Sequence, residues 1–240
     1  MGNSAATTGR LSFGVVGAGP VGAVLAKALA SAGHVLIGIS STSPKNIERA
    51  EALMPEVNVL TVPEIIEKAD LILLAIPADE IAKTVSGLSE AGLFRAGQLL
   101  AHTAGEFGVE VLQPAISKGV IPLAIHPAIT FTGTTIDLAR IRESYFAVAA
   151  PNVALPIVQA LVIEMGAEPI VISEADRKTY FEAISVANNF SKLIVNQSIG
   201  LLESVGIGNA RQVLAPVLRS AVEEALAEGH VPIDPEELLN

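Results

Sequence analysis

The stretch GVVGAGPVGAVLAKALASAGHVLIGISS, residues 14–41, decides how this chain folds. It continues a β-branched run typical of a strand, and the spacing Gly17-x-Gly19-x-x-Gly22 then opens an Ala-rich segment typical of a helix. In that order, the three glycines permit a tight turn, the approach of a pyrophosphate to the backbone, and close packing of the helix on the strand. The helix N-terminus adds free N–H groups and a positive dipole end. The pattern predicts a dinucleotide-binding turn made by Gly17, Gly19, Pro20, Val21 and Gly22; the alternative is a glycine-rich turn that keeps the packing and binds no ligand.

The residues at the end of the next strand, ISSTSPKN at 39–46, indicate which of the two nicotinamide cofactors, NAD or NADP(H), the chain prefers. An acidic side chain there accepts hydrogen bonds from a free ribose 2′-hydroxyl and repels a 2′-phosphate. No acidic residue occurs between Gly14 and Asn46, so the sequence favours NADP(H) over NAD. Two alternatives stay open, because Ser43 also suits a helix cap and Lys45 a solvated first turn. The expected 2′-phosphate contacts are Ser40, Ser41, Ser43 and Lys45.

Residues 11–173 alternate between short β-branched runs and helix-like segments. Repeated strand–helix–strand units with right-handed crossovers build a doubly wound, mostly parallel sheet that binds ligands at the carboxyl ends of its strands. We therefore predict an α/β Rossmann domain. The expected strands are 11–18, 34–40, 57–61, 70–77, 98–104, 120–127, 145–150 and 169–173, and the expected helices are 20–33, 43–55, 63–69, 79–91, 108–119 and 152–165.

Strand signals cease after Glu174. Unbroken helical periodicity predicts one long helix over 175–206 and a second over 210–228, which form a small all-helical domain. The expected organisation is a disordered tail (1–10), a dinucleotide-binding Rossmann domain (11–174) and a helical domain (175–240) for substrate binding and dimerisation. The final DPEELLN, residues 234–240, carries helix-start signals, which indicate either a short capping turn or a chain that ends inside a longer helical domain.

Composition narrows the possible partners. A formal net charge of −10 argues against an extended nucleic-acid surface, although a small anion needs only a local positive site. The longest apolar stretch, near residues 71–78, is too short to span a bilayer, and the first ten residues lack a signal-peptide core. The absence of cysteine excludes disulfides and thiolate metal sites and fits a cytoplasmic location. We expect no metal, no nucleic acid and no membrane partner.

Three further loops follow expected strands, where α/β enzymes keep their working groups. LAIPAD at 74–79 is expected to line the groove beside the nicotinamide ribose with the backbone of Ala75, Ile76 and Pro77, and HTAGEFG at 102–108 follows the next strand in the same way, with Thr103 as its contact. In IHPAITFTGT, His126 stands at a strand end and is expected to bind or protonate a substrate oxygen. The alternative is a histidine bonded to loop backbone.

The long helix carries a polar face. Ser185, Asn189, Lys192 and Asn196 fall at i, i+4, i+7 and i+11, between apolar neighbours that suggest a buried helix. Buried amides and an amine need partners, which substrate, water or cofactor supplies in a cleft beside the nucleotide domain. A lysine there protonates a developing alkoxide during hydride transfer. The alternative is a solvated face or a set of polar contacts in a dimer.

The chain resembles the 6-phosphogluconate dehydrogenase-like superfamily, and most closely its bacterial Rossmann-like plus DUF2520 proteins. The matching stretches, which cover most of residues 11–230, are GVVGAGPVG, ADLILLAIPADEI, GQLLAHTAGEFGVEVL, PLAIHPAITFTGT, VIEMGAEPI and YFEAISVANNF. The superfamily includes β-hydroxyacid dehydrogenases, ketopantoate reductases and pyrroline-carboxylate reductases. The resemblance implies an N-terminal Rossmann domain, a C-terminal helical domain and dimers.

The resemblance also bears on the candidate catalytic residues. Hydroxyacid dehydrogenases and ketopantoate reductases use a helical Lys-x-x-x-Asn pair, which Lys192 and Asn196 match. The DUF2520 relatives commonly lack this lysine and keep an asparagine that corresponds to Asn189, which raises Asn189 and His126 as candidates. The relatives also tend to be longer.

These observations together predict a cytoplasmic NADP(H)-dependent oxidoreductase. It is expected to reduce a small carbonyl or imine substrate, with ketopantoate as the first candidate by resemblance, in a cleft between the two domains. The main alternative is a dinucleotide-binding sensor or scaffold without catalysis, and an NAD-dependent hydroxyacid dehydrogenase is disfavoured by ISSTS. The apolar helical domain predicts a homodimer.

Overall fold

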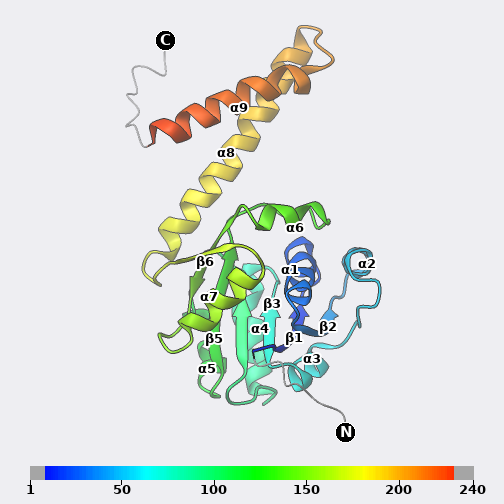
Figure 1. Ribbon diagram of the computed structural model, residues 1–240, viewed down its shortest axis with the longest axis vertical. Helices are drawn as coiled ribbons and strands as arrows, with labels where there is room; N and C mark the ends of the chain where they lie inside the picture. The colour runs from blue at the N-terminus through cyan, green and yellow to red at the C-terminus, as the bar shows by residue number, and fades with distance from the viewer. Residues whose placement is uncertain (1–8, 230–240) are drawn as a thin grey trace. The chain divides into compact units, whose positions relative to one another are not determined.

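The computed structural model describes residues 9–229 (Figure 1). The chain divides into two compact units, residues 1–182 and 183–240, and the division falls inside the long helix α8 (Arg177–Ser204). Most of the expected N-terminal tail, and the helix-start signals at 234–240, lie outside the described residues.

A seven-stranded sheet forms the centre of the first unit, in the order β2-β1-β3-β4-β5-β6-β7. Neighbouring strands are parallel except β5 and β6, which pair antiparallel through Ala124–Ala149 to Pro127–Phe146. The carboxyl ends of β1 to β5 therefore meet at one edge of the sheet. The strands are β1 (Ser12–Val16), β2 (Val35–Ser40), β3 (Leu71–Leu74), β4 (Leu99–His102), β5 (Ile121–Pro127), β6 (Tyr145–Ala149) and β7 (Glu168–Val171).

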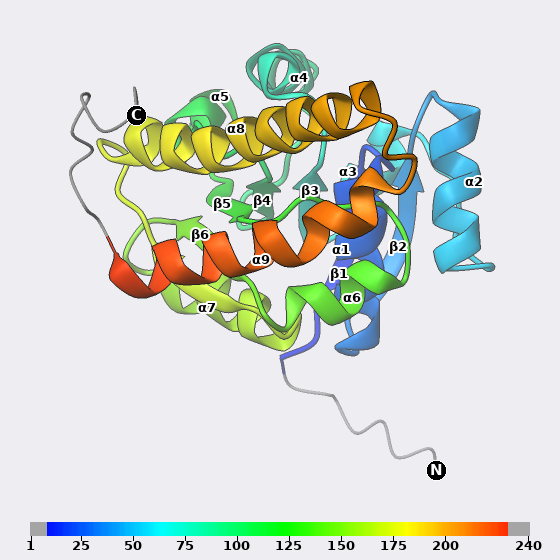
Figure 2. The same ribbon diagram turned by 90° about the horizontal axis from the view of Figure 1, so that it is seen from above.

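Both faces of the central strands are buried. Phe13 and Val15 of β1 pack into a core with α1, α6 and α7, whereas Val16 packs into a second core with α3, α4 and α5. The apolar strand sequences follow from this, because a strand covered on both faces needs no polar alternation. Figure 2 shows α4 and α5 on one side of the sheet and α1, α6 and α7 on the other. The Rossmann fold class predicted from the sequence is confirmed.

The helices of this unit follow the strands as the alternating pattern predicts. Thr61, for example, begins α3 with a capping box, in which its hydroxyl accepts from the Glu64 backbone N–H and the Glu64 carboxylate accepts from the Thr61 backbone N–H. The helices are α1 (Pro20–Ser31), α2 (Pro44–Leu53), α3 (Val62–Lys68), α4 (Ala78–Glu90), α5 (Gln113–Ile116), α6 (Ile136–Ile141) and α7 (Leu155–Glu164), with a 3₁₀ turn η1 at Glu110–Leu112.

Three sequence predictions differ from the structure. The strand expected at 57–61 is reduced to one isolated bridge, Ile39 with Val59, because the chain turns at once into the cap of α3. The single helix expected at 108–119 is split into η1 and α5, with Pro114 in the first turn of α5, where its missing N–H is tolerated. Helix α6 was not predicted, because its six residues are too few to show a period.

The long helix α8 and the following α9 (Ala210–Glu228) occupy the residues expected for them. Within residues 9–229, no helix combines the length and apolar character that a membrane crossing requires.

Candidate functional site

The turn between β1 and α1 has the geometry that its glycines predict. Gly17 has a φ of 98°, its N–H donates to the Ser40 carbonyl at 2.9 Å, and a Cβ there would collide with the Ala75 carbonyl oxygen. A Cβ on Gly22 would collide with the Gly17 carbonyl oxygen. At Gly19 a Cβ would meet no atom within 4 Å. Gly17 and Gly22 are therefore required by packing, whereas Gly19 leaves open space at the start of α1, where a phosphate finds free N–H groups.

A groove of about 530 Å³ opens over this turn. Its walls come from three neighbouring strand ends, after β1, β2 and β3, which is where a doubly wound sheet binds ligands. Most of the predicted cofactor contacts line it. The lining residues are Val16, Gly17, Gly19, Pro20, Val21, Ser40, Ser41, Thr42, Ser43, Asn46, Val62, Ala75, Ile76, Pro77 and Glu80.

Three predicted cofactor contacts do not line the groove. Gly22 is buried beneath the turn, where it packs α1 on the strand. Lys45 is exposed on the first turn of α2. Thr103 donates its backbone N–H to the Leu74 carbonyl at 3.2 Å, which extends the pairing of β4 with β3.

The wall after β2 is rich in hydroxyl groups. Ser43 occupies the N-cap position of α2, yet its side chain makes no cap hydrogen bond. Ser41 Oγ accepts from the Ser43 backbone N–H at 3.2 Å. The capping alternative for the Ser43 side chain is therefore not what the structure shows, and Ser43 is one of the residues that line the groove.

Asn46 and Arg49 of α2 were missed by the sequence analysis. Asn46 lines the groove, and its Oδ1 accepts a 2.6 Å hydrogen bond from Arg49 Nη1. The Arg49 side chain also lies so close to Gly133 that a Cβ on Gly133 would press against it. Residues three apart on a helix share a face, so the spacing could have indicated the contact of Arg49 with Asn46 but not its contact with Gly133. Arg49 is thus the cation held directly behind the hydroxyl-rich wall.

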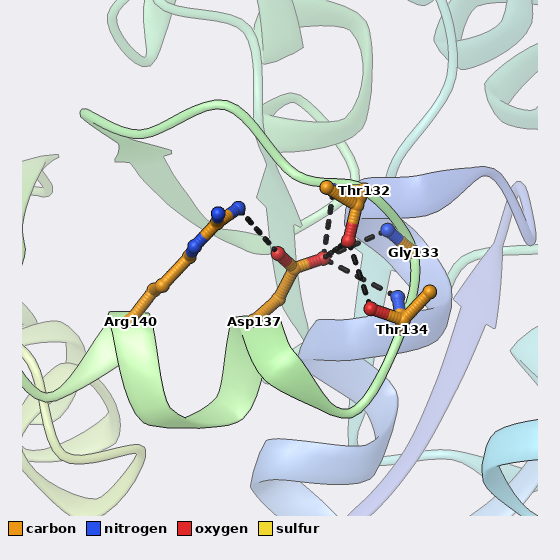
Figure 3. Close-up of polar contacts among 5 residues, drawn as sticks. All are labelled: Thr132, Gly133, Thr134, Asp137 and Arg140. Atoms are coloured by element: carbon orange, nitrogen blue, oxygen red, sulfur yellow. Dashed lines mark hydrogen bonds and ion pairs between the residues drawn. The ribbon is translucent and has the colours of Figure 1, made fainter. Parts of the chain in front are cut away.

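The loop from β5 to α6 packs beside the phosphate turn, where Gly133 approaches the backbone of Pro20. Figure 3 shows how Asp137 holds this loop: one carboxylate oxygen accepts from the backbone N–H of Thr132 and of Gly133, each at 2.7 Å, and from that of Thr134. Asp137 is fully buried. Burial raises its pKa, but the hydrogen bonds from Gly133 and Thr132 outweigh burial and leave the pKa below its usual value.

His126 lies at the carboxyl end of β5 against the first turns of α8. Its Nδ1 is hydrogen-bonded to the Tyr180 hydroxyl at 2.8 Å, and its ring makes edge contacts with Tyr180 and Phe181. A Cβ on Gly105 would collide with Phe181 and lie 2.8 Å from His126 Nε2. Burial and the nearby charges of Arg177 and His102 lower the pKa of His126 to about 4. At neutral pH the ring is uncharged, so it offers a neutral N–H rather than an imidazolium proton.

His102 and Arg177 form the most buried part of this site. The His102 side chain is inaccessible to solvent, its Nε2 donates to the Gly108 carbonyl at 2.7 Å, and burial lowers its pKa to about 4. Arg177, in the first turn of α8, is only 1% exposed, and burial lowers its pKa. Neither residue was singled out from the sequence, because periodicity does not show that a charged residue at a helix start is buried.

The predicted polar face of α8 lies in the second unit. Ser185, Asn189, Lys192 and Asn196 do fall on one continuous helix, with the last three exposed. Their apolar neighbours are exposed too, as the values for Val186 (48%), Phe190 (57%) and Leu193 (58%) show, so the expectation of a buried helix was wrong.

Comparisons with known proteins agree with the fold. Family models match at residues 1–127 (Rossmann-like domain) and 144–233 (domain of unknown function DUF2520). A search of curated proteins gave no match.

Three solved structures share the fold at low identity. A provisionally assigned NADP oxidoreductase from Bacteroides fragilis has a TM-score of 0.76 at 18% identity, over 90% of this chain and 80% of its own. The Streptococcus pyogenes 1-pyrroline-5-carboxylate reductase gives 0.67 at 16% identity, over 96% and 84%. The Plasmodium falciparum pyrroline carboxylate reductase, with NADP bound, gives 0.66 at 15% identity, over 92% and 80%. As its motifs predicted, the chain belongs to the Rossmann-like family, with a DUF2520 domain after the Rossmann fold.

Proposed function

We propose that this protein is an NADP(H)-dependent oxidoreductase that reduces a small carbonyl or imine compound. The observation that carries the proposal is the groove over the β1–α1 turn, where Gly19 leaves open space at a helix N-terminus between three strand ends. These residues fit a dinucleotide pyrophosphate. When bound there, the cofactor supplies the hydride. The related folds of two pyrroline-carboxylate reductases support a reductase.

The preference for NADP(H) rests on the wall after β2. Ser40 to Ser43 offer hydroxyl donors where NAD-specific proteins place an acid. Arg49, bonded to Asn46 behind that wall, supplies the positive charge that a 2′-phosphate requires. We therefore assign the charge-bearing role to Arg49 in place of Lys45. Neither residue lines the groove, but Arg49 is bonded to the lining residue Asn46, whereas Lys45 is exposed on the first turn of α2.

His126 is our candidate for the residue that contacts the substrate carbonyl or imine. With a pKa of about 4 it is uncharged at neutral pH, so we propose that it orients and polarises the substrate carbonyl or imine through its N–H. Proton delivery by Lys192 and positioning by Asn189 and Asn196 stay predictions, as does the location of the substrate between the two domains. Ketopantoate remains the first 2-keto acid to try.

The test is a fluorescence titration with NADPH and NADH, followed by a panel of 2-keto acids and cyclic imines. Arg49→Ala is expected to raise the Kd for NADPH by roughly tenfold to a hundredfold and to leave the Kd for NADH almost unchanged. Lys45→Ala is the matched control, one turn away on the same helix, with near-normal affinity for both cofactors. Equal binding of NADPH and NADH by the unaltered protein would remove the NADP assignment.

A binding protein without catalysis is the second candidate. The DUF2520 relatives that lack the lysine corresponding to Lys192 favour it. It predicts NADPH binding without turnover of any compound in the panel. Full activity in Lys192→Ala would remove only that residue from the mechanism.

We also propose a homodimer through the helical segment. The apolar side chains Val213, Val217 and Val222 of α9 are 42%, 59% and 54% exposed, which is more than a monomeric helix usually leaves uncovered. Light scattering coupled to gel filtration measures the mass, and Val217→Glu is expected to lower it to that of one chain. The cytoplasmic location and the exclusion of nucleic-acid partners stay predictions.

A further inference from the structure

The buried polar atoms without a partner gather in one place. Across residues 9–229, the buried side-chain atoms that lack a hydrogen bond are His102 Nδ1 and the Nε, Nη1 and Nη2 of Arg177. The two residues are close enough for the charge of Arg177 to lower the pKa of His102. Both belong to the first unit, at the carboxyl end of β4 and the start of α8.

The groups around Arg177 are already engaged elsewhere. The Glu174 carboxylate accepts from the backbone N–H of Gly108 at 3.0 Å and of Val109 at 2.8 Å. The Tyr180 hydroxyl is bonded to His126. A guanidinium carries five N–H donors in a planar fork, and leaving them unpaired in the interior is strongly unfavourable. Burial lowers the pKa of Arg177 and the charge of the Glu174 carboxylate raises it, but neither Glu174 nor Tyr180 accepts a hydrogen bond from the guanidinium. The fold therefore keeps a buried fork of N–H donors without acceptors.

His102 adds a hydrogen-bond acceptor to the donors of Arg177. Because its Nε2 donates to the Gly108 carbonyl, the neutral ring presents Nδ1 as a bare acceptor. A ligand that satisfies both residues must bring an anionic, planar acceptor for the guanidinium and a hydroxyl or N–H donor for the imidazole. A 2-hydroxy acid or 2-amino acid has both groups on adjacent carbons.

We propose that Arg177 and His102 form a binding site for the carboxylate of a small 2-hydroxy or 2-amino acid. Arg177 binds the carboxylate through two N–H groups, and His102 Nδ1 accepts from the neighbouring hydroxyl or amine. His126 lies beside the site, and the charge of Arg177 lowers its pKa. This inference rests on the proposed function only where it calls the ligand a substrate.

The direct test is a calorimetric titration of the full chain with lactate and pyruvate, in the presence and absence of NADPH. Methyl lactate, the uncharged ester, and sodium chloride at equal ionic strength are the control ligands. The guanidinium nitrogens have no exposed surface, so we expect the ligand to enter slowly. The heat signal is therefore recorded after each addition until it returns to the baseline. We expect lactate to bind, pyruvate to bind more weakly because it has no donor for His102 Nδ1, and both controls to fail.

Variants identify the residue responsible. Arg177→Met is expected to raise the Kd for the carboxylate by roughly tenfold to a hundredfold, with a smaller rise for Arg177→Lys, which keeps the charge and loses the fork. Lys178→Met, at the exposed neighbouring position, is the matched control and should bind as the unaltered protein does. An unchanged Kd in Arg177→Met, binding of methyl lactate at equal affinity, or no binding of either acid would overturn the proposal.

Thermal unfolding separates a ligand-binding arginine from a structural one. Since the guanidinium has no partner, Arg177→Met should unfold at the same or a higher temperature, whereas a structural arginine would give a lower one. If Arg177→Met fails to fold, a structural role is indicated and the proposal falls unless Arg177→Lys folds and binds the acid more weakly. NADPH titration of the same samples measures the cofactor groove separately. In the unaltered protein, NADPH binding without binding of either acid refutes this inference alone, whereas weakened acid binding with NADPH binding intact in Arg177→Met supports it.

Discussion

At the residue scale, three glycines within six positions have different tasks. Gly17 is fixed by its positive φ and by the Ala75 carbonyl, and Gly22 by its close approach to the Gly17 carbonyl oxygen. Gly19 has an ordinary φ of −63° and open space where its side chain would be. The same residue type is thus required by packing at two positions, whereas at the third it leaves the open space where we propose that the pyrophosphate binds.

Alanine at two of these positions should separate stability from binding. Gly17→Ala combines a disfavoured φ with a backbone collision, and we expect it to lower the free energy of unfolding by about 2–4 kcal/mol. Gly19→Ala should change stability by less than about 1 kcal/mol and raise the Kd for NADPH about tenfold or more, because its methyl group occupies the path of the pyrophosphate. Urea unfolding followed by circular dichroism and NADPH fluorescence provide the two measurements. Normal NADPH affinity in Gly19→Ala would show that the pyrophosphate lies elsewhere.

The sequence predicted the packing roles of Gly17 and Gly22 because their spacing alone sets the turn, and the role of Gly19 stays a prediction. It did not predict Arg177 or Arg49. Each is a charged residue on a helix whose importance comes from what surrounds it: burial among loop residues for Arg177, and contact with Gly133, 84 positions away, for Arg49. Such contacts join segments that periodicity treats separately.

At the element scale, long or strongly patterned elements could be predicted and short ones could not. Helices α8 and α9, of 28 and 19 residues, occupy the expected positions because many turns repeat one pattern. The six-residue α6 depends instead on the buried Asp137, which gathers the N–H groups of the preceding loop. The position of α6 is thus set by one side chain, whereas the position of α8 is set by a repeated pattern.

Replacing Asp137 should therefore loosen a whole element. Asp137→Ala leaves the N–H groups of Thr132 and Gly133 without their acceptor, and we expect a loss of about 2–4 kcal/mol in the free energy of unfolding. NADPH affinity should fall as well, because Gly133 packs against Pro20 and Arg49. Arg140→Ala, which removes only an exposed partner of Asp137, is the control and should cost less than about 0.5 kcal/mol. Equal stability of the two variants would mean that the loop is held by other contacts.

At the scale of the whole molecule, the buried site ties stability to pH. His102 and His126 both have pKa values of about 4 in the folded protein, against 6.5 for a free histidine. Above pH 6.5 both states are neutral, and the two histidines add no pH dependence. As the pH falls below 6.5, the unfolded chain binds protons that the folded protein does not, so the free energy of unfolding decreases until about pH 4.

This decrease can be measured by urea unfolding at a series of pH values. A shift of this size corresponds to about 3 kcal/mol for each histidine at most. His102→Gln, which keeps an N–H donor for the Gly108 carbonyl, should lose about half of the decrease, and the double variant with His126→Gln nearly all of it. Asp137 acts in a separate, more acidic window, because its lowered pKa gives stability that is lost only below the usual carboxyl range. If His102→Gln shows the same decrease from pH 6.5 to 4 as the unaltered protein, folding does not lower the pKa of His102, and the decrease has another source.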